Sequence, residues 1–174
     1  MNFHILYQTP AGIDNLWIAS DGECLTEVRF IRTKPCADVT ADLPVFRETR
    51  RWLDCYFSGH EPGFLPHYRI ANGLTDFRRE VLELLLEIPF GQTTTYGALA
   101  KELARRRGVM RMSAQAVGGA VGWNPLCIII PCHRVIGADG KMTGYGGGLP
   151  NKVALLSHEA SSGAKQLTKG QCFR

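Results

Sequence analysis

Several features are missing from this chain, and each absence narrows the class of protein. No apolar run approaches the roughly 18 residues that a membrane-spanning helix requires, so we expect no membrane association. The N-terminus, residues 1–6, has no basic region ahead of a long apolar core, so we expect no signal peptide. The six cysteines include no Cys-x-x-Cys pair, and no two histidines have the zinc-finger spacing. We therefore predict a cytoplasmic protein with reduced thiols, no metal site and no cofactor.

The composition describes an ordinary globular protein. The 174 residues suffice for one domain of average size or for two small ones. Hydrophobic residues make up 45% and charged residues 21%, which argues against wholesale disorder. The net charge of +4 permits binding to a polyanion but does not demonstrate it.

The first half of the chain is predicted to be a scaffold. Residues 3–9, 16–20 and 24–31 are short β-prone runs, and Asp21-Gly22 is a hairpin signal. A helix follows, because apolar and small residues recur at helical spacing: Val45, Thr49, Trp52, Leu53 and Tyr56. Residues 59–73 are typical of a linker. These patterns predict a small antiparallel sheet plus one helix, and we find no residues for chemistry in this half.

The second half is predicted to be helical, with three capping residues. Thr75 can cap a helix that carries Phe77, Val81, Leu84, Leu85 and Ile88 on one face. Thr94 or Thr95 can cap residues 96–105, and Ser113 can cap residues 114–121. The turn between these two helices is rich in arginine. A helix, a basic turn and a helix resemble a DNA-binding helix-turn-helix, although a solvated basic loop is the plainer alternative.

The helix after Ser113 contains Gly118-Gly119. Each glycine costs about 1 kcal/mol relative to alanine inside a helix, so two together indicate that something approaches the backbone closely. The partner could be another helix or a ligand. If it is DNA, a slender face of Ala116, Gly119 and Ala120 suits the minor groove, which is about 6 Å wide.

The strongest chemical signal follows the apolar run Leu126–Ile130. Five apolar residues are consistent with a buried strand, although periodicity alone does not exclude another buried form. Pro131 ends such a strand, and Cys132, His133 and Arg134 come next. A thiol at the end of a rigid strand, beside groups that can ionise it, is well placed as a nucleophile. The alternative is a buried, inert cysteine, which is what we expect of Cys127 within the run.

The last third of the second half contains a glycine-rich loop and a final helix. Residues 143–148 lack the Gly-Lys-Ser/Thr ending of a nucleotide-binding loop. Their backbone amides could instead converge on a flat ligand, with Tyr145 as a wall. The final helix is predicted to carry Leu149, Val153 and Leu156 and to end near Glu159. Residues 163–174 form a polar tail.

Taken together, these motifs resemble one family, the O6-alkylguanine-DNA alkyltransferases, also called methylated-DNA–protein-cysteine methyltransferases. The resemblance runs from about residue 75 to 159, and its most specific motif is Pro131-Cys132-His133-Arg134-Val135. The N-terminal half matches only in outline. The other matching motifs are Thr75-Asp76-Phe77, Gly91 with Tyr96, Ala116-Val117-Gly118-Gly119, Asn124-Pro125, Gly144-Tyr145-x-Gly147-Gly148 and His158-Glu159.

The resemblance implies a fold and an activity. The fold would be an α/β N-terminal domain with linker (residues 1–73), then a mainly helical C-terminal domain with a helix-turn-helix (74–162), then a tail (163–174). The activity would be DNA repair by direct reversal of damage. Such a monomeric methyltransferase binds the minor groove of double-stranded DNA and flips out an O6-alkylguanine. It then transfers the alkyl group once, irreversibly, to its own cysteine, with O4-alkylthymine as an open second substrate.

The resemblance also implies roles for individual residues. Cys132 would accept the alkyl group, His133 would act as a base through a water, and Glu159 would orient and charge the imidazole. Asn124 would brace the turn that holds the cysteine, and Tyr96 would contact the flipped base and help protonate it as it leaves. The predicted substrate contacts are Tyr145, the Gly146 amide, the Cys132 and Val135 carbonyls, Gln115 and Trp123. The predicted DNA contacts are Tyr96, Ala116, Gly119, Ser113, Arg134, Arg105, Arg106, Arg107 and Arg111.

One position departs from the family pattern. Family members often have an arginine that enters the duplex beside the flipped base, and this chain has Gln115 there. Gln115 can fill the gap and form hydrogen bonds, but it brings no charge. We expect Arg105, Arg106, Arg107 and Arg111 to compensate at phosphates.

Thiolate chemistry alone does not account for such an activity. A free thiol of pKa about 8.5 is about 3% ionised at pH 7, so complete ionisation gains at most about 30-fold, near 2 kcal/mol. Positioning for in-line attack and stabilisation of the leaving base must therefore supply most of the acceleration.

Two other classes of protein stay open. The first is a DNA-damage-binding or regulatory module that uses the helix-turn-helix and in which the thiol is incidental. The second is a cysteine hydrolase, but adjacent Cys132 and His133 would need a water between them rather than a direct hydrogen bond. A related group of alkyltransferase-like proteins lacks the acceptor cysteine, and the presence of Cys132 argues against that assignment.

Overall fold

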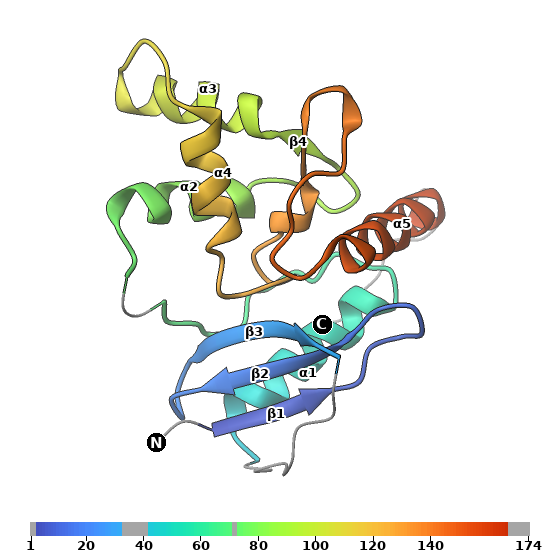
Figure 1. The fold of residues 1–174 in the computed structure, drawn as a ribbon. Coiled ribbons are helices and arrows are strands. Elements are labelled where there is room, and N and C mark those ends of the chain that lie inside the picture. Colours follow the sequence, from blue (N-terminus) through green and yellow to red (C-terminus); the bar gives the residue numbers. More distant parts are fainter. Residues whose placement is uncertain (1–2, 33–41, 71–72, 167–174) are drawn as a thin grey trace.

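The structure is a computed structural model that describes residues 3–32, 42–70 and 73–166. It has two parts, a sheet packed on one helix and, above it in Figure 1, a group of helices. The predicted order of an α/β part followed by a mainly helical part is confirmed. Within the described ranges, no helix is both long and apolar enough to cross a membrane.

The sheet is a three-stranded antiparallel meander. Its strands are β1 (Phe3–Tyr7), β2 (Asn15–Ser20) and β3 (Leu25–Ile31), in that order. Ile18 lies opposite Ile5 on one side and Val28 on the other, and all three are buried. Helix α1 (Pro44–Phe57) packs behind the sheet and buries all five of the residues predicted for its inner face.

The helices of the second part begin at the predicted caps. They are α2 (Asp76–Leu86), α3 (Tyr96–Arg107) and α4 (Ala114–Gly122). The side chains of Thr75, Thr95 and Ser113 each accept a hydrogen bond from the backbone amide three residues later, as capping residues do. Helix α3 is two residues longer than predicted and ends at Gly108, whose φ of 65° is the left-handed conformation that suits glycine.

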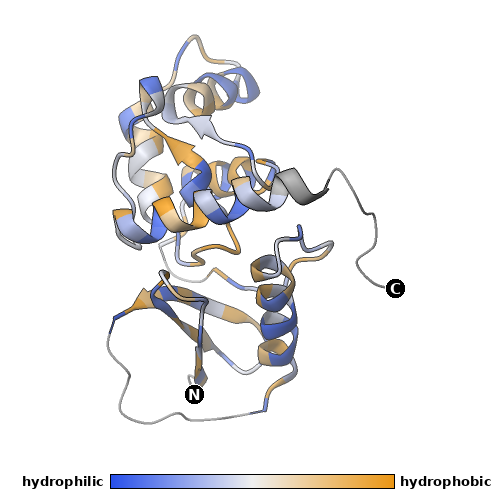
Figure 2. Cartoon of the chain, turned by 90° about the vertical axis from the view of Figure 1, so that its right-hand side faces the viewer, coloured by the Kyte–Doolittle hydropathy of each residue, from blue (hydrophilic) through white to orange (hydrophobic). Residues whose placement is uncertain are grey.

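The apolar run at 126–130 is not a strand but a buried turn, the kind of alternative that periodicity left open. The chain reverses at Ile128, which has a φ of 70°, and the Ile130 amide bonds back to the Leu126 carbonyl at 2.9 Å. The turn attaches to β3 through two backbone bonds, from the Val28 amide to the Pro125 carbonyl (2.8 Å) and from the Cys127 amide to the Val28 carbonyl (2.9 Å). A buried strand and a buried turn both require apolar residues, so the hydrophobicity of the run did not distinguish them. Figure 2 shows a hydrophobic stretch of chain between the two parts.

The segment after this turn is built from short elements. A single turn of 3-10 helix, Cys132–Arg134, leads directly into β5 (Val135–Ile136). Strand β5 pairs in parallel with β4 (Thr94–Thr95), which immediately precedes α3. This pairing holds the start of α3 beside the Cys132–Arg134 turn.

Helix α5 (Leu149–Gln166) differs from prediction in length and in orientation. It continues past Glu159 to Gln166, so the predicted tail is helical at its start, and residues 167–174 lie outside the described residues. Leu149 and Val153 are exposed, at 43% and 46%. The buried face is mainly polar and consists of Asn151, Lys152, Leu155, Glu159 and Ser162.

Candidate active site

The Cys132 sulfur is held inside the protein by donors from its own segment. Cys132 is 5% exposed, and its sulfur accepts a hydrogen bond from Asn124 Nδ2 at 3.0 Å. The same amide nitrogen reaches the Ile130 carbonyl (2.8 Å), and Asn124 Oδ1 accepts from the Leu126 amide (3.0 Å). Asn124 therefore ties both ends of the apolar turn to the thiol, which is the geometry that its predicted bracing role requires.

The electrostatic surroundings favour a thiolate at Cys132. A hydrogen bond with the Cys127 side chain lowers the pKa of Cys132 most, and Asn124, a backbone amide and the Lys152 charge add to this against the effect of burial. A nucleophilic thiol is active as the thiolate. Among the described residues, no group of three His, Cys, Asp or Glu side chains is placed to hold a metal ion.

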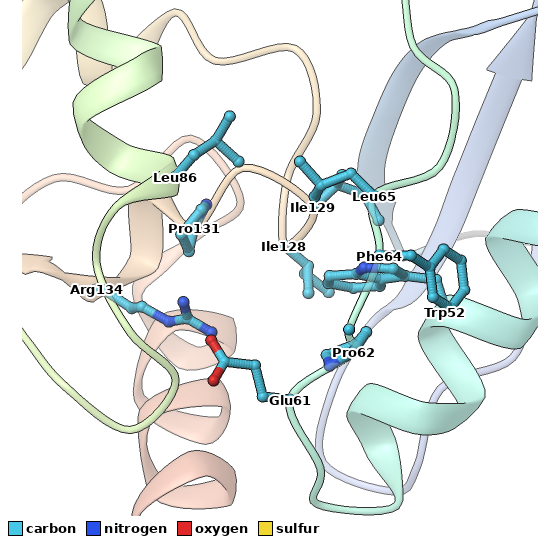
Figure 3. Close-up of a pocket in the computed structure, with 11 residues that line it drawn as sticks. Trp52, Glu61, Pro62, Phe64, Leu65, Leu86, Ile128, Ile129, Pro131 and Arg134 are labelled. Carbon is cyan, nitrogen blue, oxygen red and sulfur yellow. The ribbon is translucent and has the colours of Figure 1, made fainter. Parts of the chain in front are cut away.

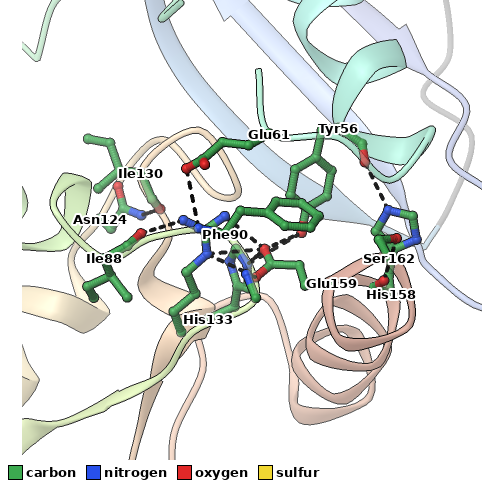
Figure 4. A network of polar contacts seen from close by, with 12 residues as sticks. Tyr56, Glu61, Ile88, Phe90, Asn124, Ile130, His133, His158, Glu159 and Ser162 are labelled. Atoms are coloured by element: carbon green, nitrogen blue, oxygen red, sulfur yellow. Dashed lines mark hydrogen bonds and ion pairs between the residues drawn. The ribbon is translucent and has the colours of Figure 1, made fainter. Parts of the chain in front are cut away.

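His133, which follows Cys132 in the chain, forms a buried pair with Glu159 (Figure 4). His133 is 0% exposed and Glu159 is 1% exposed, and His133 Nε2 lies 2.8 Å from Glu159 Oε1. Burial raises the pKa of Glu159, but hydrogen bonds and charge from His133 and Arg134 outweigh this and hold the pKa at about 2. The carboxylate is therefore ionised and can only accept hydrogen bonds.

The pair fixes the tautomer of the histidine. Burial lowers the pKa of His133, so the ring is neutral near pH 7 and carries one proton. That proton must lie on Nε2, which faces the Glu159 carboxylate. Nδ1 is then the basic nitrogen, and it is buried with no hydrogen-bond partner among the described residues. A neutral imidazole with a free acceptor nitrogen is able to take a proton.

Tyr56 reaches this pair from the N-terminal part, which corrects the prediction that the first half holds no residues for chemistry. It is 0% exposed, and its hydroxyl donates to Glu159 Oε1 at 2.8 Å and lies 3.4 Å from His133 Nε2 (Figure 4). Sequence reasoning assigned Tyr56 correctly to the buried face of α1. Nothing in the spacing along α1 indicated that its hydroxyl would meet a carboxylate from α5.

Arg134 was predicted to contact DNA, and the structure contradicts this. It is 7% exposed, and its guanidinium contacts both Glu159 oxygens at 3.0–3.2 Å and the Ile88 carbonyl at 2.7 Å. A buried carboxylate needs a partner of opposite charge, and Arg134 supplies it. The role of Arg134 is therefore internal.

Lys152 is a buried charged residue that the sequence analysis did not assign to the site. Its side chain is buried, and Nζ donates to the Val135 carbonyl at 2.6 Å and to the Thr143 carbonyl at 3.0 Å. These carbonyls belong to the segment after Cys132 and to the glycine-rich loop, so Lys152 links the two. The Val135 carbonyl, predicted to read a guanine amino group, already accepts from Lys152 and has one further lone pair.

The glycine-rich loop contains a tyrosine whose hydroxyl is buried. Burial raises the pKa of the Tyr145 hydroxyl first, and the charges of Cys132 and Cys127 raise it further. Glycine suits position 147, because a Cβ there would clash with the rings of Phe30 and Tyr145. Tyr96 OH donates to the Gly144 carbonyl at 3.3 Å. Tyr96 therefore contacts the loop that contains Tyr145.

The structure gives no reason to include Trp123, or the cavity shown in Figure 3, among the residues around Cys132. Trp123 ends α4 and lies under the Arg78 guanidinium, 4.4 Å from the ring centre, which gives no support to a role in substrate binding. A cavity of about 320 Å³ is lined by Trp52, Ile128, Pro131 and Arg134, among others (Figure 3). Cys132 is not among the residues that line it. This cavity is therefore not the predicted base pocket.

The exposed face of α4 matches the predicted DNA contacts in part. Gln115, Ala116 and Gly119 are exposed, and a Cβ at Gly119 would meet nothing within 4 Å. Ala120 is buried, so it does not belong to this face. Gly118 instead packs against the Tyr96 ring, where a Cβ would lie at 3.6 Å. The two glycines therefore serve different purposes, one facing the protein and one facing solvent.

The arginines of the turn are less available than predicted. Arg105 and Arg106 bind Glu102 within α3, and Arg106 also binds Glu87. Arg107 binds Glu80 at 2.8 Å. All three remain exposed, as do Arg111 and Ser113. Glu102 precedes two of the arginines by three and four residues, so this part of the pairing could have been read from the sequence.

Comparisons with known proteins agree with this arrangement. A family model described as the DNA-binding domain of 6-O-methylguanine DNA methyltransferase matches residues 76–161. A methylated-DNA–protein-cysteine methyltransferase of Methanosarcina acetivorans is 38% identical over 163 residues, which cover 91% of this chain and 99% of the relative. One of Mycobacterium bovis is 40% identical over 168 residues, covering 94% and 98%.

Solved structures give the same result. A crystal structure of Mycobacterium tuberculosis OGT in complex with DNA has a TM-score of 0.75 and 38% identity, and the match covers 92% of this chain and 94% of that one. An O6-methylguanine-DNA methyltransferase from Pyrococcus kodakaraensis has a TM-score of 0.63 and 26% identity, covering 91% and 99%. The chain therefore belongs to the methylated-DNA–protein-cysteine methyltransferase family.

Proposed function

We propose that this protein repairs DNA by moving the alkyl group of O6-alkylguanine onto Cys132, once and irreversibly. The assignment to Cys132 rests on one arrangement. The Cys132 sulfur accepts a hydrogen bond from Asn124 at 3.0 Å, and the next residue, His133, is buried with its Nε2 2.8 Å from the Glu159 carboxylate. This arrangement provides an ionisable nucleophile, a neutral base and an anion that orients the base.

The chemistry follows from the positions of these groups. His133 Nδ1 removes the Cys132 proton through a water, since adjacent residues do not present their side chains to each other directly. The thiolate attacks the alkyl carbon, a sulfur–carbon bond forms, and the bond from that carbon to O6 breaks. The electron pair stays on the guanine, which must gain a proton or a hydrogen bond to leave, and Tyr96 is the predicted donor. A thioether is not hydrolysed under these conditions, so each protein acts once.

Access to the sulfur requires movement of the segments that bury it. Cys132 is 5% exposed. We expect the loop that contains Tyr145 to move when a flipped base reaches the sulfur. Flipping itself costs a few kcal/mol, and a weakened alkylated pair reduces that cost. The exposed face of α4, with Gln115, Ala116 and Gly119, is the proposed minor-groove contact.

The test is incubation with a duplex that contains O6-methylguanine with a labelled methyl group. We expect one methyl group per protein at completion, and a gain of one methyl mass on the peptide that contains Cys132. Binding without transfer would support the DNA-binding module instead. Repeated release of product from each protein would support a hydrolase and contradict the proposal.

Gln115 makes a separate prediction about salt. Replacing Gln115 with arginine adds one cation on the exposed face of α4, so the slope of log K against log salt should become steeper by up to about 0.9. The slope is measured by fluorescence anisotropy on a duplex at several salt concentrations. Gln115→Met is the uncharged control and should keep the parent slope. Equal slopes for the parent and Gln115→Arg would place this residue away from phosphate.

A further inference from the structure

Tyr56 belongs to α1, yet its hydroxyl lies inside the cluster around Glu159. It donates to Glu159 Oε1 at 2.8 Å, and the same oxygen accepts from His133 Nε2 at 2.8 Å and from Arg134 at 3.0 Å. The other carboxylate oxygen, Oε2, accepts from the Gly91 amide at 2.9 Å. The tyrosine and the histidine therefore share one negatively charged oxygen (Figure 4).

The packing around Tyr56 fixes its hydroxyl as a donor. The residue is fully buried, and its ring stacks on that of Trp52 and meets the Phe90 ring edge-on, each with 5.6 Å between ring centres. His158 Nε2, from α5, lies 2.9 Å from the Tyr56 carbonyl. Burial raises the pKa of the hydroxyl well above its usual value, and the Glu159 charge adds to this. The hydroxyl therefore stays protonated at neutral and acidic pH.

A donor on the carboxylate changes how strongly His133 holds a second proton. The negative Glu159 oxygen attracts a charged imidazole, and each further donor to that oxygen weakens the attraction. Two cations, Arg134 and Lys152, also disfavour the charged ring. The Tyr56 hydroxyl acts in the same direction, because it lies 2.8 Å from the carboxylate oxygen and 3.4 Å from Nε2 of the histidine. It therefore favours the neutral imidazole, the form that can act as a base.

We propose that Tyr56 is a positioning residue by which the N-terminal part of the protein sets the proton affinity of His133, through the Glu159 oxygen that both residues share. This inference rests on the proposed role of His133 as the base for Cys132. Tyr56 acts through Glu159 rather than on the alkyl group. The sheet-and-helix part thereby takes part in the reaction, although the sequence pattern marks Tyr56 only as core.

The test is Tyr56→Phe, which removes the hydroxyl and keeps the ring. The His133 ring is titrated without DNA by NMR on protein with labelled histidine, and a His133→Gln sample identifies its signals. We expect Tyr56→Phe to raise the pKa of His133 by about one unit. Tyr7→Phe is the matched control, because it removes a hydroxyl that donates to a different carboxylate, Asp54, at 2.7 Å. Its His133 titration should match that of the parent.

Transfer kinetics give the second measurement. The single-turnover rate of Tyr56→Phe should fall at acidic pH, by up to about tenfold, and approach the parent rate by about pH 8. A His133 titration that coincides with the parent would overturn the proposal, as would a rate that falls equally at every pH, which is what a purely structural role would produce. Because the titration needs no transfer, it separates failure of this inference from failure of the proposed function.

Thermal unfolding sets the temperature of these measurements, at which each variant must be folded. The parent supplies a further measurement if Tyr56→Phe does not fold. A buried hydroxyl that donates to a carboxylate exchanges its proton slowly with water, so NMR on protein with labelled tyrosine should detect the Tyr56 hydroxyl proton close to the His133 ring. A Tyr56 hydroxyl that exchanges as fast as an exposed one would contradict the proposal.

Discussion

Cys132→Ser is expected to abolish methyl transfer, with a loss of more than about a thousandfold. A serine hydroxyl does not ionise near neutral pH, so the Asn124 amide and the Lys152 charge have no anion to stabilise. DNA affinity should be unchanged, because Cys132 is 5% exposed and offers little surface to the duplex. Transfer of labelled methyl is measured in single-turnover conditions, and affinity by fluorescence anisotropy on an unmodified duplex.

The control for this substitution is Cys24→Ser, which changes a cysteine with intermediate exposure in the N-terminal part. It should transfer at the parent rate. Transfer that survives in Cys132→Ser would move the acceptor role elsewhere, and peptide mass spectrometry would then show which cysteine carries the methyl group. Loss of DNA binding in Cys132→Ser would mean instead that the sulfur supports the structure of the DNA-binding surface.

Glu159→Gln is expected to cause the largest loss of stability. It leaves the Arg134 guanidinium, whose side chain is 8% exposed, without its carboxylate partner. Breaking a buried ion pair in this way costs about 3–5 kcal/mol, which lowers the Tm by about 10 °C in a chain of this size. Transfer should also fall, because the Tyr56–Glu159–His133 contacts set the orientation and tautomer of the histidine. Thermal unfolding and single-turnover transfer measure the two effects.

Two further variants test whether loss of the buried ion pair causes this destabilisation. Arg134→Met combined with Glu159→Met removes both charges and should recover much of the stability but not the transfer rate. Glu80→Gln breaks the exposed ion pair with Arg107 and should leave the Tm almost unchanged. If Glu159→Gln unfolds at the parent temperature, the buried cluster is not what stabilises this part of the fold.

The pH dependence of this loss has a defined direction. The pKa of Glu159 is about 2 in the folded protein, below the ordinary value of about 4.3. A lowered carboxyl pKa contributes stability that is fully present above the unfolded pKa and is lost as pH falls through the folded one. The difference in stability between the parent and Glu159→Gln should therefore be constant above about pH 5 and shrink toward pH 2.

Local sequence patterns were sufficient to predict the helix starts, the buried face of α1 and the region of the site. Thr75, Thr95 and Ser113 each cap a helix. A short hydroxyl side chain just before a stretch with helical spacing of apolar residues can accept a hydrogen bond from an amide of the first turn. The buried face of α1 followed from its period, and the Pro131–Arg134 motif identified the region of the site. These features depend on neighbours within a few residues, which a sequence displays directly.

Features that depend on distant partners were missed. Helix α5 buries Asn151, Lys152 and Glu159, and a pattern search for apolar residues selected Leu149 and Val153 instead. Those polar residues are satisfied by Asp14, by the Val135 carbonyl and by Arg134, none of which lies in α5. Tyr56 was missed for the same reason, because its partner is distant in the sequence. Its hydroxyl reaches Glu159 only because α1 and α5 meet.

The attachment of the acceptor turn to β3 has a consequence for how the protein tolerates mutation. The backbone of Val28 bonds to Pro125 and to Cys127, so an edge strand of the sheet in the first part supports the peptide that presents the sulfur. A substitution that disturbs the middle of β3 would therefore impair repair without altering any residue near the lesion. Few substitutions should be tolerated at Val28, as at the reactive centre, although the two lie far apart in the sequence.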